Sequence, residues 1–535
     1  MSENRYPIIY VRGYAMSANE RDETAADPFC GFNVGSTVYR ATVKKDAPAQ
    51  KFVFESPVVR LLSEHGYQNV YQNGLDILDE DWKPAPDGET GADVEGIPPT
   101  SVIIYRYYDP GSRLLGDGET SEIETYAIGL GKLILRVRDL VGQRHGPGFV
   151  PDDFRCYLVA HSMGGLVVRA LLQNKALGSP EARAAVAKVF TYATPHNGIE
   201  FGGVNVPSWL TASEIDTFSR PVMQKYLATA PVDGRMNFLP ADIQPTRENW
   251  FCMIGSNRGD YEAAHGVARM FSGHGSDGLV LIENASLWSR DDAELDRPVG
   301  SAYTFRSHSG YFGIVNSEEA YQNLVRFLFG DIRVDLWFDV EKVQLPHELE
   351  EKQSKVDAVY QVELLASPRG KRWYLSRRIA EEDSPACRTH KELKTDGASP
   401  AKEIYLSTVF LANRSKVDAK RPGLSYAMTL GVRVPDYQVD NKFWLDGHYE
   451  GSSLYRDTLV LDMIPPPPGA ATDKWDVRYG WQSESTGRAP IVLPTSFQQI
   501  KDGKMVFRIG LSSLTDSTKR PGITGSVRLE VSAWK

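Results

Sequence analysis

The hydrophobic pattern of this chain changes its period once, near residue 331 of 535. Up to that point short apolar runs, as at residues 8–11, 102–107 and 156–160, alternate with segments whose apolar residues recur at helical spacing. After it, apolar and polar residues alternate strictly in short runs, as at residues 334–340. The first pattern predicts an α/β fold with a mostly parallel sheet, and the second predicts an all-β, sandwich-like fold.

Two patterns of this length predict two domains. A single hydrophobic core stops growing at roughly 250 to 300 residues, so 535 residues are too many for one core. The helical pattern at residues 319–329 suits a closing helix for the first domain. We therefore predict an α/β domain over residues 1–332 and a β-sandwich-like domain over residues 333–535.

One tract, residues 199–243, interrupts the alternation of strands and helices in the first domain. It is long, it lies between two predicted strands, and it carries apolar residues that we expect to be exposed: Trp209, Leu210, Phe218, Met223 and Tyr226. Long insertions of this kind commonly cover a functional site. The tract is predicted to be an inserted, lid-like segment.

The charge balance and the cysteines exclude several classes of function. With 60 basic and 69 acidic residues the formal net charge is −9, which leaves no excess of positive charge for a nucleic acid. Four scattered cysteines form neither a disulfide framework nor a CxxC pair with the spacing of metal ligands. The N-terminus lacks a secretory signal, and no apolar run is long enough to span a bilayer. We expect a soluble chain, cytoplasmic by default, while export by a non-classical route stays open.

The segment at residues 157–169, YLVAHSMGGLVVR, carries the clearest chemical signal. A buried strand runs through Ala160 into Ser162 and then, past Gly164 and Gly165, into an apolar helix. A serine on a tight turn between strand and helix is a nucleophile elbow, which needs small residues on both sides of the serine. A serine near glycines alone would be a turn, but the strand before it and the helix after it favour Ser162 as a nucleophile.

A serine nucleophile needs a histidine base, and four histidines that follow Ser162 are candidates: His196, His265, His274 and His308. His308 lies in a glycine-containing loop just before the closing helix, where the last loop of the sheet can reach the serine. We favour His308, with His274 as its main alternative. For His196, which follows a strand directly, we expect a structural role.

The base needs an acidic residue to orient it, and Asp277 suits this role. It lies in Gly275-Ser276-Asp277-Gly278, a loop before an apolar run and 31 residues ahead of His308. Asp260 is the alternative. For either aspartate an Asx turn or a helix cap is the competing interpretation.

An oxyanion hole needs two N–H groups aimed at the developing negative charge. One is expected to be the amide of Met163, which follows the nucleophile. The other is expected from the loop after the first strand, Arg12-Gly13-Tyr14, with the amide of Tyr14 as the donor.

These motifs resemble the lipase and esterase branch of the α/β-hydrolase family. AHSMGG at 160–165 is similar to the elbow of small bacterial lipases, and YATPHNG at 192–198 is similar to a strand end shared by bacterial lipases and lecithin:cholesterol acyltransferase-like enzymes. SDGLV at 276–280 resembles the acid loop of that group. The resemblance covers residues 1 to about 330. It implies an α/β-hydrolase fold with Ser162 as nucleophile, Asp277 as acid, His308 as base, and Tyr14 and Met163 as oxyanion donors.

The sequence departs from that family in two places. Such lipases usually have His-Gly after the first strand, where this chain has Arg12-Gly13, and the resemblance does not extend to the last 200 or so residues. By fold-level analogy, a β-sandwich in some lipases contacts a lipid surface or a protein partner. The tryptophans of this region are either exposed anchors or core residues, and we favour the core: Trp373, Trp444, Trp475, Trp481 and Trp534.

The function that these observations predict is cleavage of a carboxylic ester, such as a lipid, by a serine hydrolase through an acyl-enzyme intermediate. No metal or organic cofactor is expected for this chemistry. A phospholipase, a thioesterase or an acyltransferase would use the same three residues, and a catalytically inactive hydrolase-like binding protein is the non-enzymatic alternative. The oligomeric state stays open.

Overall fold

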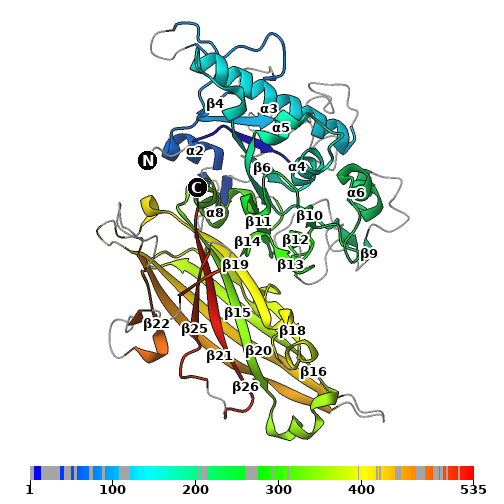
Figure 1. Cartoon of the computed structure of the whole chain (residues 1–535), viewed down its shortest axis with the longest axis vertical. Helices are drawn as coiled ribbons and strands as arrows, with labels where there is room; N and C mark the ends of the chain where they lie inside the picture. Colours follow the sequence, from blue (N-terminus) through cyan, green and yellow to red (C-terminus); the bar gives the residue numbers. More distant parts are fainter. Residues whose placement is uncertain are drawn as a thin grey trace. The chain divides into compact units, whose positions relative to one another are not determined.

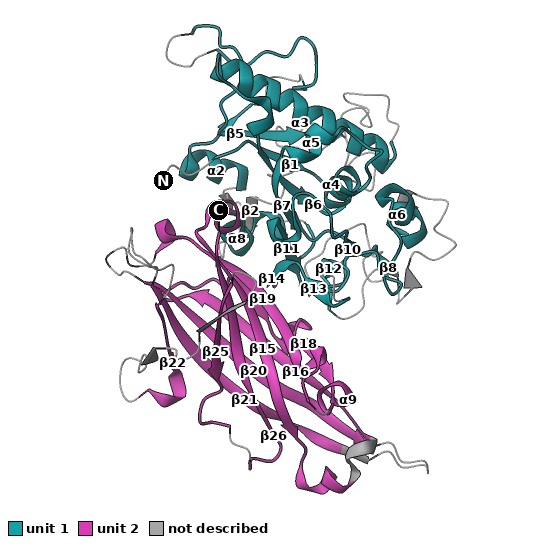
Figure 2. Ribbon diagram, in the orientation of Figure 1, with its two compact units in different colours: residues 1–301, 305–324 teal, residues 302–304, 325–535 magenta. Residues whose placement is uncertain are grey.

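The computed structural model describes most of the chain in two compact units (Figure 2). One unit comprises residues 1–301 and 305–324, and the other comprises residues 302–304 and 325–535. The described residues are 5–13, 37–40, 50–53, 57–70, 76–86, 91–107, 121–201, 204–205, 214–258, 275–291, 294–309, 313–395, 397–416, 418, 420, 423–439, 447–464, 476–485, 493–494, 498–501, 504–515 and 518–534.

A seven-stranded sheet with helices around it makes up most of the first unit (Figure 1), while residues 302–304 of its edge strand and residues 325–329 of its last helix belong to the second unit. Its strand order is β14 (Gly300–Thr304), β11 (Trp250–Gly255), β7 (Val186–Tyr192), β6 (Cys156–His161), β1 (Ile8–Val11), β5 (Ser101–Tyr105) and β4 (Gln68–Asn69). The pairs from β11 through to β4 run parallel. The predicted α/β class with a mostly parallel sheet is confirmed.

Both faces of this sheet are covered. All four residues of β1 and the first five of β6 are buried, and successive side chains of a strand point to opposite faces. The surrounding helices are α2 (Pro57–His65), α3 (Ile123–His145), α4 (Met163–Gln173), α5 (Pro180–Ala184), α6 (Arg220–Leu227) and α8 (Glu318–Phe329). Smaller pieces are the strand pair β2 (Thr37–Arg40) with β3 (Gln50–Val53), the pair β8 (Glu200–Phe201) with β9 (Val204–Asn205), and the sheet of β10 (Phe238–Leu239), β12 (Trp288–Arg290) and β13 (Asp296–Pro298).

The apolar residues of tract 199–243 are less exposed than the sequence suggests. Phe218, Met223 and Tyr226 are buried, so the expectation that they are exposed is wrong. Met223 and Tyr226 lie on the short helix α6, which packs against α4 with its apolar face inward. Phe218 ends the 3-10 helix Glu214–Phe218, which packs against α6. Trp209 and Leu210 lie outside the described residues.

The second unit contains two antiparallel sheets. One has the order β19 (Glu403–Leu411), β15 (Ile332–Gln344), β26 (Gly522–Ala533), β25 (Lys504–Gly510) and β24 (Gln498–Lys501). The other has the order β17 (Ser376–Arg378), β16 (Val356–Pro368), β20 (Leu424–Val439), β21 (Gly447–Ile464), β22 (Asp476–Trp481) and β23 (Leu493–Pro494), with β18 (Ala386–Thr389) also paired to β16. A one-turn helix, α9 (His390–Leu393), follows β18.

Alternate residues of both sheets share one core, as the period of two predicts. Val334, Leu336 and Phe338 of β15 are buried in the same cluster as Tyr360 of β16 and Leu430 of β20. The sandwich-like fold of this region is confirmed. Its described tryptophans belong largely to the interior: Trp481 and Trp534 are buried, and Trp373 packs against the core while partly exposed. Trp444 and Trp475 lie outside the described residues.

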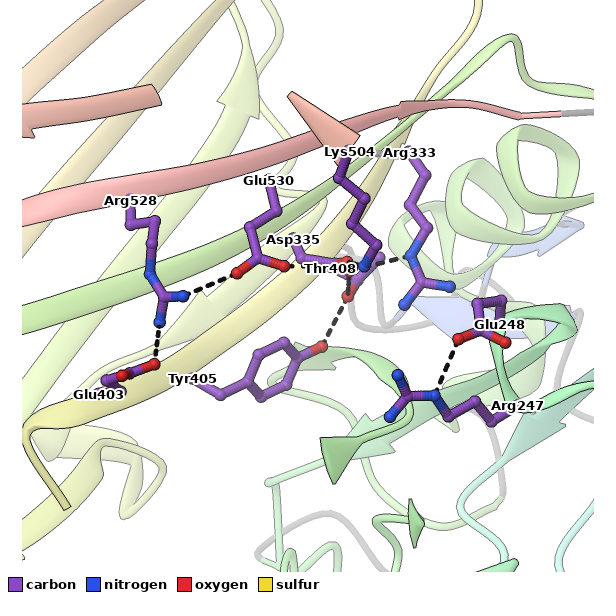
Figure 3. A network of polar contacts seen from close by, with 10 residues as sticks. All are labelled: Arg247, Glu248, Arg333, Asp335, Glu403, Tyr405, Thr408, Lys504, Arg528 and Glu530. Carbon is purple, nitrogen blue, oxygen red and sulfur yellow. Dashed lines mark hydrogen bonds and ion pairs between the residues drawn. The ribbon is translucent and has the colours of Figure 1, made fainter. Parts of the chain in front are cut away.

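A buried ion network occupies β15 and its neighbours (Figure 3). The carboxylate of Asp335 accepts hydrogen bonds from Arg333 Nε at 3.0 Å, Thr408 Oγ1 at 2.6 Å and Lys504 Nζ at 2.8 Å. These donors come from β15, β19 and β25, so the network links three strands of one sheet.

Among the described helices of either unit, none combines the length and the apolarity needed to cross a bilayer.

Candidate active site

Three predicted site residues follow the carboxyl ends of strands of the parallel sheet. Ser162 comes directly after β6, Asp277 lies in the loops that follow β11, and His308 follows β14. Because parallel strands end at the same edge of a sheet, residues far apart in the sequence are brought together there. The structure brings these three side chains into contact.

The serine occupies a strained turn between β6 and α4. Its backbone has φ 51° and ψ −125°, a conformation that side-chain-bearing residues rarely adopt. The turn needs the glycines that follow: a β-carbon at Gly164 would collide with the carbonyl oxygens of Val11 and Arg12, and one at Gly165 would collide with Thr194. This is the geometry of a nucleophile elbow, in which the hydroxyl projects from the edge of the sheet.

The three side chains form a continuous chain of hydrogen bonds. Ser162 Oγ lies 2.8 Å from His308 Nε2, and His308 Nδ1 lies 2.9 Å from Asp277 Oδ2. All three residues are buried. Since a carboxylate can only accept, the proton of the neutral imidazole lies on Nδ1, which leaves Nε2 to accept from the serine hydroxyl.

The two oxygens of Asp277 have different partners. Oδ1 accepts hydrogen bonds from the amides of Leu279, at 3.0 Å, and Val280, at 2.8 Å, while Oδ2 faces His308. The sequence left two interpretations of Asp277, an Asx turn or a partner of the histidine. The structure contains both the Asx turn and the contact with His308. The turn fixes the carboxylate, and the backbone amide of His308 donates to the Asp277 carbonyl at 2.9 Å.

The loop after β1 lies against the serine. A β-carbon on Gly13 would be 2.7 Å from the β-carbon of Ser162, so only a glycine backbone fits there without displacement. Met163 is the first residue of α4, and the first amides of a helix have no acceptor within the helix. Tyr14, the other expected oxyanion donor, lies outside the described residues.

Of the other candidates for base and acid, His196 is the one that the structure describes. His196 is buried, and its Nε2 lies 3.2 Å from Thr191 Oγ1. His265, His274 and Asp260 lie outside the described residues.

Arg169 contacts the backbone of His196, and sequence reasoning missed it. Its buried guanidinium donates to the carbonyl oxygens of His196 at 2.8 Å, Met236 at 2.8 Å and Phe238 at 3.2 Å. Burial lowers the pKa of Arg169 to about 10. The residue ties helix α4 to the TPHNG turn and to β10, and a lone arginine on an apolar helix was the only signal for it.

His161 was also missed as a contributor to the site. It precedes Ser162, and its Nε2 lies 2.9 Å from the backbone carbonyl oxygen of His308. The two imidazole rings have centroids 5.1 Å apart. No pattern in the sequence pairs these residues, because the contact depends on where the loop after β14 lies relative to the end of β6.

Comparisons with known proteins give little beyond this geometry. Neither the known protein families nor the curated proteins contain a match to the chain. Among solved structures, the product of the gene lin2722 from Listeria innocua matches with 12% identity and a TM-score of 0.26, over 61% of this chain and 94% of that chain. Among the described residues, no three or more histidine, cysteine, aspartate or glutamate side chains lie close enough together to bind a metal ion. With a TM-score this low, the likeness assigns neither a family nor a reaction to this chain.

Proposed function

We propose that the protein is a serine hydrolase that cleaves carboxylic esters. The observation that carries the proposal is the unbroken chain of hydrogen bonds from Ser162 Oγ through the imidazole of His308 to the carboxylate of Asp277. A serine hydroxyl is a poor nucleophile at neutral pH, and this arrangement supplies the base and the group that orients the base.

The reaction proceeds in two halves. Ser162 Oγ attacks the ester carbonyl carbon as its proton passes to His308 Nε2, and the negative charge develops on the former carbonyl oxygen. The tetrahedral intermediate collapses, the alkoxide leaves with the proton from His308, and an acyl-serine remains. A water molecule then attacks that acyl group, gives a proton to His308, and releases the acid while the proton returns to Ser162.

Each of the neighbouring groups has a part in this scheme. Asp277 stabilises the imidazolium that forms in each half and keeps the proton of the resting imidazole on Nδ1. The amide of Met163, at the N-terminus of α4, is the proposed donor to the oxyanion, where the positive end of the helix dipole also favours negative charge. The amide of Tyr14 remains the expected second donor.

The test uses the full chain and Ser162→Ala. Wild-type protein should hydrolyse short p-nitrophenyl esters and should be labelled once per chain by a fluorophosphonate probe, at Ser162. We expect Ser162→Ala to lower turnover by at least about 10,000-fold and to abolish labelling. Ser63→Ala, at an exposed serine of α2, is the matched control and should change neither. Retained hydrolysis in Ser162→Ala, or a labelled serine elsewhere, would overturn the proposal.

A second assay identifies the acyl acceptor. Because water is the acceptor in the proposed reaction, the free acid should accumulate at the same rate with and without added alcohols or lipid vesicles. An ester of the added alcohol as the main product would make the enzyme an acyltransferase that uses the same residues.

A further inference from the structure

His161 contacts the base through the main chain of the base. Its Nε2 lies 2.9 Å from the carbonyl oxygen of His308, and a carbonyl can only accept, so this nitrogen carries the proton. The contact does not involve the ring nitrogens of His308, which face Ser162 and Asp277. His161 therefore takes no part in the proton transfer between Ser162 and His308, although it contacts the backbone of His308.

The backbone of His308 is held on both sides of its α-carbon. The amide of His308 donates to the Asp277 carbonyl at 2.9 Å, and the carbonyl of His308 accepts from His161. The imidazole of His308 cannot turn relative to Ser162 unless its rotamer changes or its backbone amide or carbonyl group moves. The distance of 2.8 Å between His308 Nε2 and Ser162 Oγ thus depends on both backbone contacts.

His161 is suited to this position because it is neutral. Burial lowers its pKa well below the ordinary value, and the nearby charges of His308, when protonated, and of Arg12 lower it further. A neutral donor 5.1 Å from the base, ring to ring, does not repel the imidazolium that His308 becomes during the reaction. On its other side, the Nδ1 atom of His161 lies 3.0 Å from the position of a β-carbon on Gly13. The ring therefore fills the space between the loop after β1 and the loop that carries the base.

We propose that His161 is a positioning residue: its imidazole N–H fixes the backbone of His308, so that the base keeps its alignment with Ser162 in both protonation states. The inference rests on the proposed function, because alignment of a base matters only if the base takes a proton. A misplacement of a reacting group by about 1 Å costs on the order of 100-fold in rate.

Two amide side chains separate this role from general structural support. In His161→Gln the amide nitrogen can occupy the place of Nε2 and donate to the His308 carbonyl. In His161→Asn the side chain is shorter, and its amide reaches only the place of Nδ1. Both side chains are polar and neutral, so the two variants differ mainly in whether they donate a hydrogen bond to the His308 carbonyl oxygen.

The measurements are kcat, KM and the rate of fluorophosphonate labelling, all per labelled serine so that unfolded protein does not count. We expect His161→Asn to lower kcat and the labelling rate by about 10- to 100-fold, with KM within about 2-fold of wild type. His161→Gln should stay within about 3-fold of wild type in both rates. His161→Leu, which has no donor, should resemble His161→Asn.

Two outcomes would overturn the positioning role. One is a kcat for His161→Asn equal to that of wild type. The other is a loss in His161→Gln as large as in His161→Asn, which would mean that the ring itself, and not its donor, is needed. Wild-type protein that is neither active nor labelled would overturn the proposed function as well, so failure of the two proposals gives different results.

Discussion

A β-carbon placed on Gly13 would lie 2.7 Å from the β-carbon of Ser162, closer than side-chain atoms approach in proteins. The loop after the first strand of the sheet is therefore in van der Waals contact with Ser162, although 149 positions separate the two residues in the chain. Tyr107 supports the same loop, because its hydroxyl donates to the carbonyl oxygen of Arg12. This packing leaves no room for a side chain at residue 13.

Gly13→Ala should therefore impair the reaction more than the fold. The added methyl group must push the loop away from Ser162, and we expect kcat for p-nitrophenyl esters to fall by about 100-fold. Gly510→Ala is the matched control, because a β-carbon there meets nothing within 4 Å. Circular dichroism should show both variants folded. Turnover of Gly13→Ala within about 3-fold of wild type would show that the loop yields without cost.

The divided role of Asp277 makes Asp277→Asn more harmful than its small change in shape suggests. Oδ1 accepts from two backbone amides, so the oxygen of an asparagine is needed there and its NH2 group must face His308 Nδ1. That donor forces the imidazole proton onto Nε2, where it blocks acceptance of the serine proton. We expect kcat to fall by about 10,000-fold.

The comparison is with Asp277→Ala, which leaves the imidazole free to choose its tautomer. Its loss in kcat should be equal to that of Asp277→Asn or smaller. A much smaller loss in Asp277→Asn than in Asp277→Ala would show that the amide has turned over and that the two backbone amides do not fix it.

Local patterns predicted the fold class and the contact between three side chains, because strand, turn and helix signals each lie within a few residues. The order of Ser162, Asp277 and His308 along the chain follows the order of strands whose ends meet at one edge. Their catalytic roles stay a proposal. Contacts that depend on the three-dimensional course of the chain left no local signal: His161 with the His308 carbonyl, and Arg169 with three carbonyls.

The tract at residues 199–243 shows the opposite error. Phe218 and Tyr226 looked exposed because no partner for them is visible in the sequence, yet both are buried, Tyr226 where α6 packs on α4 and Phe218 in the 3-10 helix just before α6. An apolar residue without a visible partner predicts burial against something, and the sequence does not say against what.

Acid should destabilise the first unit in a range set by two histidines, the partly buried His161 and the buried His196. Burial lowers the pKa of His161 and of His196 well below the ordinary value, and the charge of Arg169 lowers that of His196 further. Unfolded histidine takes up a proton below pH of about 6.5, whereas these two stay neutral in the folded state. Above that pH these histidines do not lower the free energy of unfolding. Below it, the free energy of unfolding falls by up to about 1.4 kcal/mol per pH unit for each histidine.

Hydrogen exchange of peptides from β6 and β7, resolved by mass spectrometry between pH 7 and pH 5, measures this loss. His161→Gln removes one of the two groups, so its free energy of opening should fall about half as steeply with pH as that of wild type. Parallel curves for the two proteins would contradict the assignment of His161 as a neutral histidine in the folded state.

In the second unit, Asp335 is expected to be the most costly carboxylate to remove. Although burial alone raises its pKa, the charges of Arg333 and Lys504 hold that pKa below the ordinary value. Asp335→Ala would remove the buried carboxylate that both cations share, although Glu530 Oε2 stays 3.7 Å from Lys504 Nζ, and we expect it to cost about 3 to 5 kcal/mol of stability. Asp476→Ala is the control, because the pair of Asp476 with Arg478 is about half exposed and should contribute less than about 1 kcal/mol.

The pH dependence gives an independent check on the same carboxylate. A folded-state pKa below the unfolded value of about 3.9 means that Asp335 stabilises the fold above that pH, and that this contribution disappears as the pH falls through the folded-state value. Hydrogen exchange of peptides from β15 and β26 should therefore show wild type losing stability below pH of about 4, while Asp335→Ala, already weaker at pH 7, loses less. A difference between the two proteins that stays constant from pH 7 to pH 2 would show that Asp335 acts by packing and not by charge.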